Sequence, residues 1–115
     1  MLFRSPKSPK PVPTTRPIVR VDTSQRLEHT ISFIDEDGST AKPDGVRGCQ
    51  IWIKVGEPVT DISELSFISS DTSSPYVYRF RVEDANKNVY YWLRWENTRS
   101  ETGPWSDVVT ATITG

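Results

Sequence analysis

Apolar and polar residues alternate along the chain in short stretches that are separated by turns. Six stretches show this alternation, and 64–69 is a shorter strand candidate; the full set is 17–23, 29–37, 49–55, 64–69, 76–83, 89–97 and 108–114. Successive side chains of a strand point to opposite faces, so the alternation predicts half-buried β-strands. None of the stretches shows the 3.6-residue period of an amphipathic helix.

The apolar faces of these strands predict one shared hydrophobic core. Four residues are expected near its centre: Phe33, Ile51, Leu93 and Trp95. In the stretch 76–83 the same alternation places Phe80 and Val82 on the inward face. Aromatic side chains bury a large area each, so they compensate for a hydrophobic content of only 35%.

Turn-forming residues are concentrated between the predicted strands. Examples are DEDGSTAKPDG at 35–45, EDANKN at 83–88 and TRSETGP at 98–104. Gly, Pro, Asn, Asp and Ser each favour turns for a separate physical reason. Seven short strands with regular turns favour an all-β fold, a seven-stranded antiparallel β-sandwich. A length of 115 residues is sufficient for one such core.

The end of the chain carries the most specific pattern. One strand ends at Asn97, a loop with Gly103 follows, and Trp105-Ser106 leads into the last strand in GPWSDVVTATIT. Together with PIVRVD, GCQIWIKVG and YVYRFRVED, this pattern resembles a fibronectin type III domain over residues 17–114. The chain also resembles small bacterial single-domain proteins of this type, for which no activity is known.

The resemblance implies an immunoglobulin-like topology in which strands C, F and G share one sheet. Their counterparts here are 49–55, 89–97 and 108–114. The sequence departs from the family at the turn between strands E and F, where Leu-x-Pro-Gly-Thr-x-Tyr is replaced by VEDANKNVY. Tyr90, Tyr91 or no residue at all takes the place of the family's corner tyrosine.

The beginning of the chain differs in composition from the rest. It holds four prolines within the first thirteen residues, which excludes a helix or a central strand. We therefore predict a disordered, Pro-rich basic arm over 1–16 and the sandwich over 17–115. Residues 1–21 carry five of the fourteen basic residues and no acidic one, so the remainder holds nine basic against fifteen acidic residues.

Few residues have the chemistry for catalysis or metal binding. One cysteine excludes an intrachain disulfide, and a single histidine leaves too few soft ligands for a zinc site. Cys49 is expected to be buried, whereas His29 is interpreted as a surface residue. No nucleophile motif and no glycine-rich phosphate loop is present. We therefore expect no enzyme activity, no metal and no cofactor.

The sequence gives little information on localisation. MLFRSPKSPKPVP lacks the apolar segment of a secretory signal peptide. No run of about eighteen apolar residues is present, so no transmembrane segment is predicted. The localisation stays unknown, with the cytoplasm as the default, and the same sequence is compatible with a fragment of a longer chain.

The outer face of the predicted C–F–G sheet is rich in large rings and basic groups. Six residues are the candidate binding surface: Trp52, Lys54, Tyr90, Trp92, Arg94 and Trp105. The resemblance implies that the ring of Trp105 stacks on Arg94 or Arg99, a contact worth roughly 0.5–2 kcal/mol. Two interpretations are open: a ladder that stiffens the sheet, or an exposed patch that binds a partner.

We interpret the chain as a non-catalytic protein-interaction module that uses this face. Its partner is another protein, with a second copy of the chain as one candidate. The alternative is a carbohydrate-binding or enzyme-accessory module that uses the same aromatic rings as stacking platforms. We do not expect nucleic acid to be a partner, because the basic arm has no interleaved aromatic residues. No feature of the sequence indicates a membrane partner.

Overall fold

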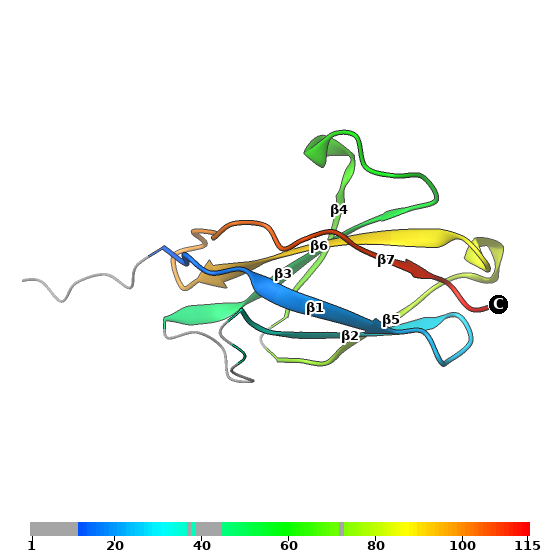
Figure 1. Ribbon diagram of the computed structural model, residues 1–115, viewed down its shortest axis with the longest axis horizontal. Coiled ribbons are helices and arrows are strands. Elements are labelled where there is room, and N and C mark those ends of the chain that lie inside the picture. The colour runs from blue at the N-terminus through cyan, green and yellow to red at the C-terminus, as the bar shows by residue number, and fades with distance from the viewer. Residues whose placement is uncertain (1–11, 37, 39–44, 72) are drawn as a thin grey trace, which may run out of the picture.

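The computed structural model describes residues 12–36, 38, 45–71 and 73–115. These residues form seven strands and two short 3₁₀ helices (Figure 1). The strands are β1 (Pro17–Asp22), β2 (Glu28–Asp35), β3 (Val46–Val55), β4 (Ser66–Asp71), β5 (Tyr76–Arg79), β6 (Asn88–Asn97) and β7 (Val109–Thr112). The 3₁₀ helices are η1 (Ile62–Glu64) and η2 (Val82–Asp84).

The strands are arranged in two antiparallel sheets that face each other. One sheet has the order β1-β2-β5 and the other has the order β4-β3-β6-β7. Figure 1 shows the two layers running along the long axis of the molecule. The fold is thus all-β, as the alternation predicts. Within the described residues, no helix is long and apolar enough to cross a membrane.

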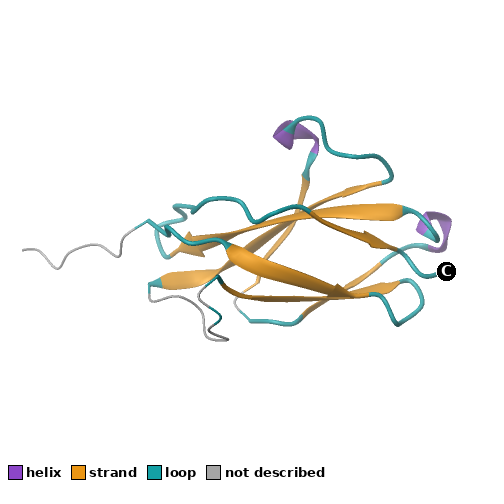
Figure 2. Cartoon of the chain, in the orientation of Figure 1, coloured by secondary structure: helices purple, strands orange, loops and turns teal. Residues whose placement is uncertain are grey.

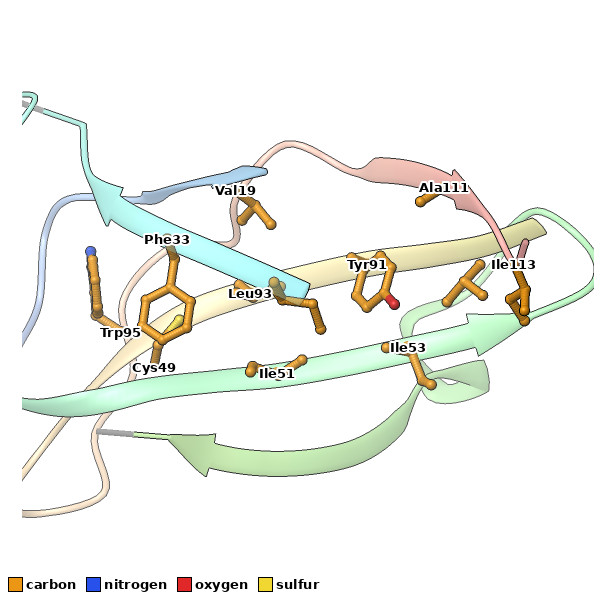
Figure 3. Packing of buried hydrophobic residues seen from close by; sticks show 12 residues of the cluster. Val19, Phe33, Cys49, Ile51, Ile53, Tyr91, Leu93, Trp95, Ala111 and Ile113 are labelled. Carbon is orange, nitrogen blue, oxygen red and sulfur yellow. The ribbon is translucent and has the colours of Figure 1, made fainter. Parts of the chain in front are cut away.

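The hydrophobic core lies between the two sheets. The four residues expected at its centre are all buried, and the rings of Phe33 and Trp95 meet edge to face at 6.0 Å. Figure 3 shows these side chains pointing into the space between the strands. Cys49 is buried in the same cluster, which confirms its expected position. The strand faces of 49–55 and 89–97 were therefore predicted correctly.

The strand predicted over 76–83 is shorter than expected. β5 ends at Arg79, where its partner β2 begins with Glu28. Just beyond it, the amide of Phe80 still donates to the carbonyl of Leu27 at 2.8 Å, but Leu27 precedes β2 and has a positive φ of 56°, so the pairing ends there and the chain turns into η2. Val82, which was expected to point inward, is 62% exposed. Phe80 keeps its predicted contact with the core.

The interpretation of His29 as a surface residue is wrong. Its side chain is fully buried, because it shares the inward face of β2 with Ile31 and Phe33. One ring nitrogen, Nε2, lies 3.0 Å from the carbonyl oxygen of Thr112 and the other, Nδ1, contacts the hydroxyl of Tyr91. A carbonyl can only accept a hydrogen bond, so Nε2 carries the proton and Nδ1 accepts from Tyr91.

Burial also changes the acid–base behaviour of this pair. Desolvation lowers the pKa of His29, and the hydrogen bond to the Thr112 carbonyl opposes this shift only in part. Desolvation raises the pKa of the Tyr91 hydroxyl, with a smaller contribution from Tyr78. Both groups are therefore neutral inside the fold. The hydroxyl of Tyr91, one of the two tyrosines considered for the corner position, thus contacts the side chain of His29.

Most of the predicted basic arm falls outside the described residues. The part that is described, 12–16, lies along the body of the fold. The hydroxyl of Thr15 donates to Asp35 at 2.7 Å. A Cβ atom added to Gly103 would lie 2.8 Å from the carbonyl oxygen of Pro13, so this close approach requires glycine. This segment therefore contacts the end of β2 as well as the loop that follows β6.

Candidate interaction surface

The outer face of the four-stranded sheet is built around the pairing of β3 with β6. Their register places three residues of β3 opposite three of β6: Gln50–Arg94, Trp52–Trp92 and Lys54–Tyr90. These residues alternate with the core residues of their strands, so all of them point to the outer face, where Gln50 is nevertheless buried. Five of the six candidate binding residues thus share one face through strand pairing alone.

The sixth candidate residue, Trp105, is held beside β6 by the segment that precedes β7. The amide of Gly103 donates to the carbonyl of Trp95, and the amide of Ser106 donates to the carbonyl of Leu93. The hydroxyl of Ser106 in turn accepts from the amide of Leu93 at 3.0 Å. Ser106 is buried, and its backbone and side chain together fix the outward position of the neighbouring tryptophan.

Four of these residues form what we call the tryptophan–arginine ladder: Trp52, Trp92, Arg94 and Trp105. The guanidinium carbon of Arg94 lies 4.1 Å from the ring centre of Trp105 and 5.8 Å from that of Trp52. Trp105 also meets Trp52 and Trp92 edge to face, at 6.1 Å and 5.9 Å. Of the two arginines considered for Trp105, the partner is therefore Arg94.

Phe67 extends the ladder to the edge of the sheet and was missed by the sequence analysis. It lies on β4 opposite Trp52, and the two rings meet at 5.1 Å. With 49% of its surface exposed, it is the most accessible large ring of this face within the described residues. Phe67 and Ile68 are adjacent, so the local pattern does not tell which of them points outward. In the structure, pairing with Trp52 places Phe67 on the outer face.

A buried polar network supports the ladder from one side. The amide oxygen of Gln50 accepts from Nε1 of Trp52 at 3.0 Å and from Nε of Arg94 at 2.8 Å. Its amide nitrogen donates to the carboxylate of Glu96 at 2.6 Å. Glu96 also pairs with Arg47 at 3.0 Å. Both Gln50 and Glu96 are buried, although polar residues in the outward phase of a strand predict exposure.

Lys54 belongs to a different set of contacts at the other end of the face. Its ammonium group pairs with Glu64 at 3.2 Å and donates to the carbonyl of Pro58 at 3.4 Å. Hydrogen bonds from the amides of Thr60 and Asp61, and then from Lys54, lower the pKa of Glu64 to about 2. Lys54 therefore anchors the loop around η1, which projects away from the sheets (Figure 2).

Two further observations concern the surface outside the ladder. Within the described part of the chain, no three His, Cys, Asp or Glu side chains are grouped so that they could hold a metal ion. A hollow of about 410 Å³ lies along β1, where its walls include Arg16, Glu36 and Asp107. None of the ladder residues lines it, so it is separate from the candidate surface.

Comparisons with known proteins assign no family to the chain. No protein-family model matches the chain, and no curated protein matches it either.

Proposed function

We propose that the chain is a fibronectin type III-like domain that acts as a non-catalytic protein-interaction module. The strand orders support the first part of this proposal. They unite β3, β6 and β7, the counterparts of C, F and G, in one sheet. They also unite β1, β2 and β5, the counterparts of A, B and E, in the other, as in immunoglobulin-like sandwiches.

The observation that carries the second part is the half-exposed Phe67 beside the tryptophan–arginine ladder. Aromatic residues and arginine dominate the binding energy of protein interfaces when they are gathered at the centre of a patch. Here Phe67, Trp52 and Arg94 lie next to one another across three strands, β4, β3 and β6. A stiff ladder also loses little conformational entropy on binding, which favours association.

The packing of the rings supports a protein partner over a carbohydrate. A sugar stacks on an open aromatic face, and Arg94 occupies a face of Trp105 at 4.1 Å. Trp52 and Trp92 are half-buried and packed against Trp105. Phe67 alone among these rings is exposed by nearly half. One exposed phenylalanine beside an arginine is better suited to an apolar side chain with a polar neighbour than to a row of sugar rings.

Photo-crosslinking in the cells that naturally produce the protein tests this proposal. A benzophenone amino acid replaces Phe67, and a matched control carries it at Val77, which is 46% exposed on the other sheet. We expect a discrete protein adduct from position 67 and none from position 77. Equal adducts from both positions, or none from position 67, would refute the interaction surface. Binding of a glycan array by the purified chain would favour the carbohydrate alternative.

A further inference from the structure

We propose that the ladder face recognises an acidic segment of its protein partner, with Arg94 as the group that binds the carboxylate. This inference rests on the proposed function and names the chemistry of the partner. The segment would carry an Asp or Glu side chain next to an apolar one. The carboxylate would meet the guanidinium of Arg94, and the apolar side chain would cover Phe67.

The guanidinium of Arg94 is held in one orientation by the fold. Its Nε donates to the amide oxygen of Gln50 at 2.8 Å, and its central carbon lies over the ring of Trp105. The indole of Trp52 is nearby and donates to the same amide oxygen. An arginine fixed in this way loses less rotational freedom when it binds a planar anion.

The two terminal nitrogens of Arg94 remain available for a ligand. Within the described residues, neither Nη atom has a hydrogen bond or an ion pair, and neither belongs to the buried polar atoms. Glu96, the acidic group whose charge acts on Arg94, already accepts from Gln50 and pairs with Arg47. A pair of parallel N–H donors with no partner fits a carboxylate in a bidentate arrangement.

Partial burial makes a counter-ion favourable at this position. Desolvation lowers the pKa of the Arg94 guanidinium, and the Glu96 carboxylate raises it by a smaller amount. Arginine nevertheless stays cationic. The ring of Trp52 lies between Arg94 and Phe67, 5.8 Å and 5.1 Å from them. The charge and the exposed ring are therefore close enough to be covered by neighbouring residues of one segment.

Gln50 acts as a positioning residue for this site. Its amide cannot be turned around, because the amide nitrogen would then face the two donors from Trp52 and Arg94 while the oxygen faced the carboxylate of Glu96. Gln50 therefore connects the ladder to the buried carboxylate of Glu96, which pairs with the half-exposed Arg47. Replacing Gln50 with methionine keeps the volume and removes the hydrogen bond that orients Arg94, together with the one from Trp52.

A titration with two short peptides tests the carboxylate preference. The probes are acetyl-Leu-Glu-Leu-amide and acetyl-Leu-Gln-Leu-amide, and the readout is the NMR shift of the arginine Nε–H and tryptophan indole N–H signals of the full chain. We expect the acidic peptide to bind about tenfold more tightly, with shifts at Arg94 and Trp52. Equal affinity of the two peptides, or no shift from the acidic peptide at about 10 mM, would overturn the proposal.

Three variants test which residues cause the preference for the acidic peptide. Arg94→Lys keeps the charge but loses the planar fork, so we expect most of the preference for the acidic peptide to disappear. Gln50→Met should reduce it several-fold and broaden the Arg94 signal, whereas Arg20→Lys, the same substitution at an exposed position of the other sheet, should leave it unchanged. An unaltered preference in the folded Arg94→Lys variant would contradict the proposal. Crosslinking from position 67 does not depend on the peptides, so it separates this outcome from a failure of the interaction surface.

Discussion

The two faces of β6 carry similar residues but bury them to different depths. On the inner face, Trp95 is only 1% exposed and packs against Phe33 between the sheets. On the outer face, Trp92 is half-buried and packs against Trp105, which comes from the segment before β7. The inner tryptophan faces the opposite sheet, whereas the outer one packs against the segment that leads into β7. The same residue type therefore stabilises the core on one face and shapes a surface on the other.

Truncation of the inner tryptophan is expected to have the largest effect on stability. Trp95→Ala removes a fully buried ring and leaves a cavity beside Phe33, which costs roughly 3–5 kcal/mol. Chemical denaturation followed by circular dichroism measures the change. A variant that does not fold under any condition would agree with this prediction, whereas an unchanged denaturation midpoint would show that Trp95 is not in the core.

Acid should weaken the inner face through His29. The folded-state pKa is lowered from about 6.5, so the unfolded chain binds the proton more readily. The stability linked to His29 is complete above about pH 6.5 and is lost as the pH falls below that value. We expect the urea midpoint to decrease between pH 7.5 and 5.5, by less than Trp95→Ala lowers it. His29→Gln should flatten this dependence; the same slope in that variant would assign it to other groups.

On the outer face we expect a smaller contribution to stability, which takes the form of a coupling free energy between two side chains. A double-mutant cycle with Trp105→Ala and Arg94→Ala measures the coupling between the ring and the guanidinium. We expect about 0.5–1 kcal/mol, as for a partly exposed cation–π contact. Arg99→Ala is the matched control, since it removes an exposed arginine nearby that has no ring contact among the described residues. Additive effects of Trp105 and Arg94 would show that the ladder is not coupled.

The smallest effect on stability is expected at Phe67. Phe67→Ser removes a half-exposed ring at the edge of the sheet, so the free energy of unfolding should change by no more than about 0.5 kcal/mol. Binding of the acidic peptide should nevertheless fall, because the apolar contact is lost. Val77→Ser, a substitution at a similarly exposed position, should change neither quantity. A large loss of stability in Phe67→Ser would instead make this ring part of the scaffold.

The alternation of the sequence was sufficient to predict most strands, their faces and the core. Side chains in a strand alternate whatever the partner strand is, so Ile51, Leu93 and Trp95 could be assigned to the inside from local information. The outward positions of Trp52 and Trp92 follow from the same rule. His29 alternates in phase with Ile31 and Phe33, so the same rule would have placed it inside. It was interpreted as exposed because it is polar and lies at the start of a strand.

The tertiary structure alone decided how the outer face is assembled. Gln50 and Glu96 are 46 positions apart, and their hydrogen bond depends on the register between β3 and β6. The exposure of Phe67 depends on the pairing of β4 with β3, and β5 ends at Arg79 because β2 offers no further partner. Register and strand length are set by pairing between distant segments, and no local pattern contains that information.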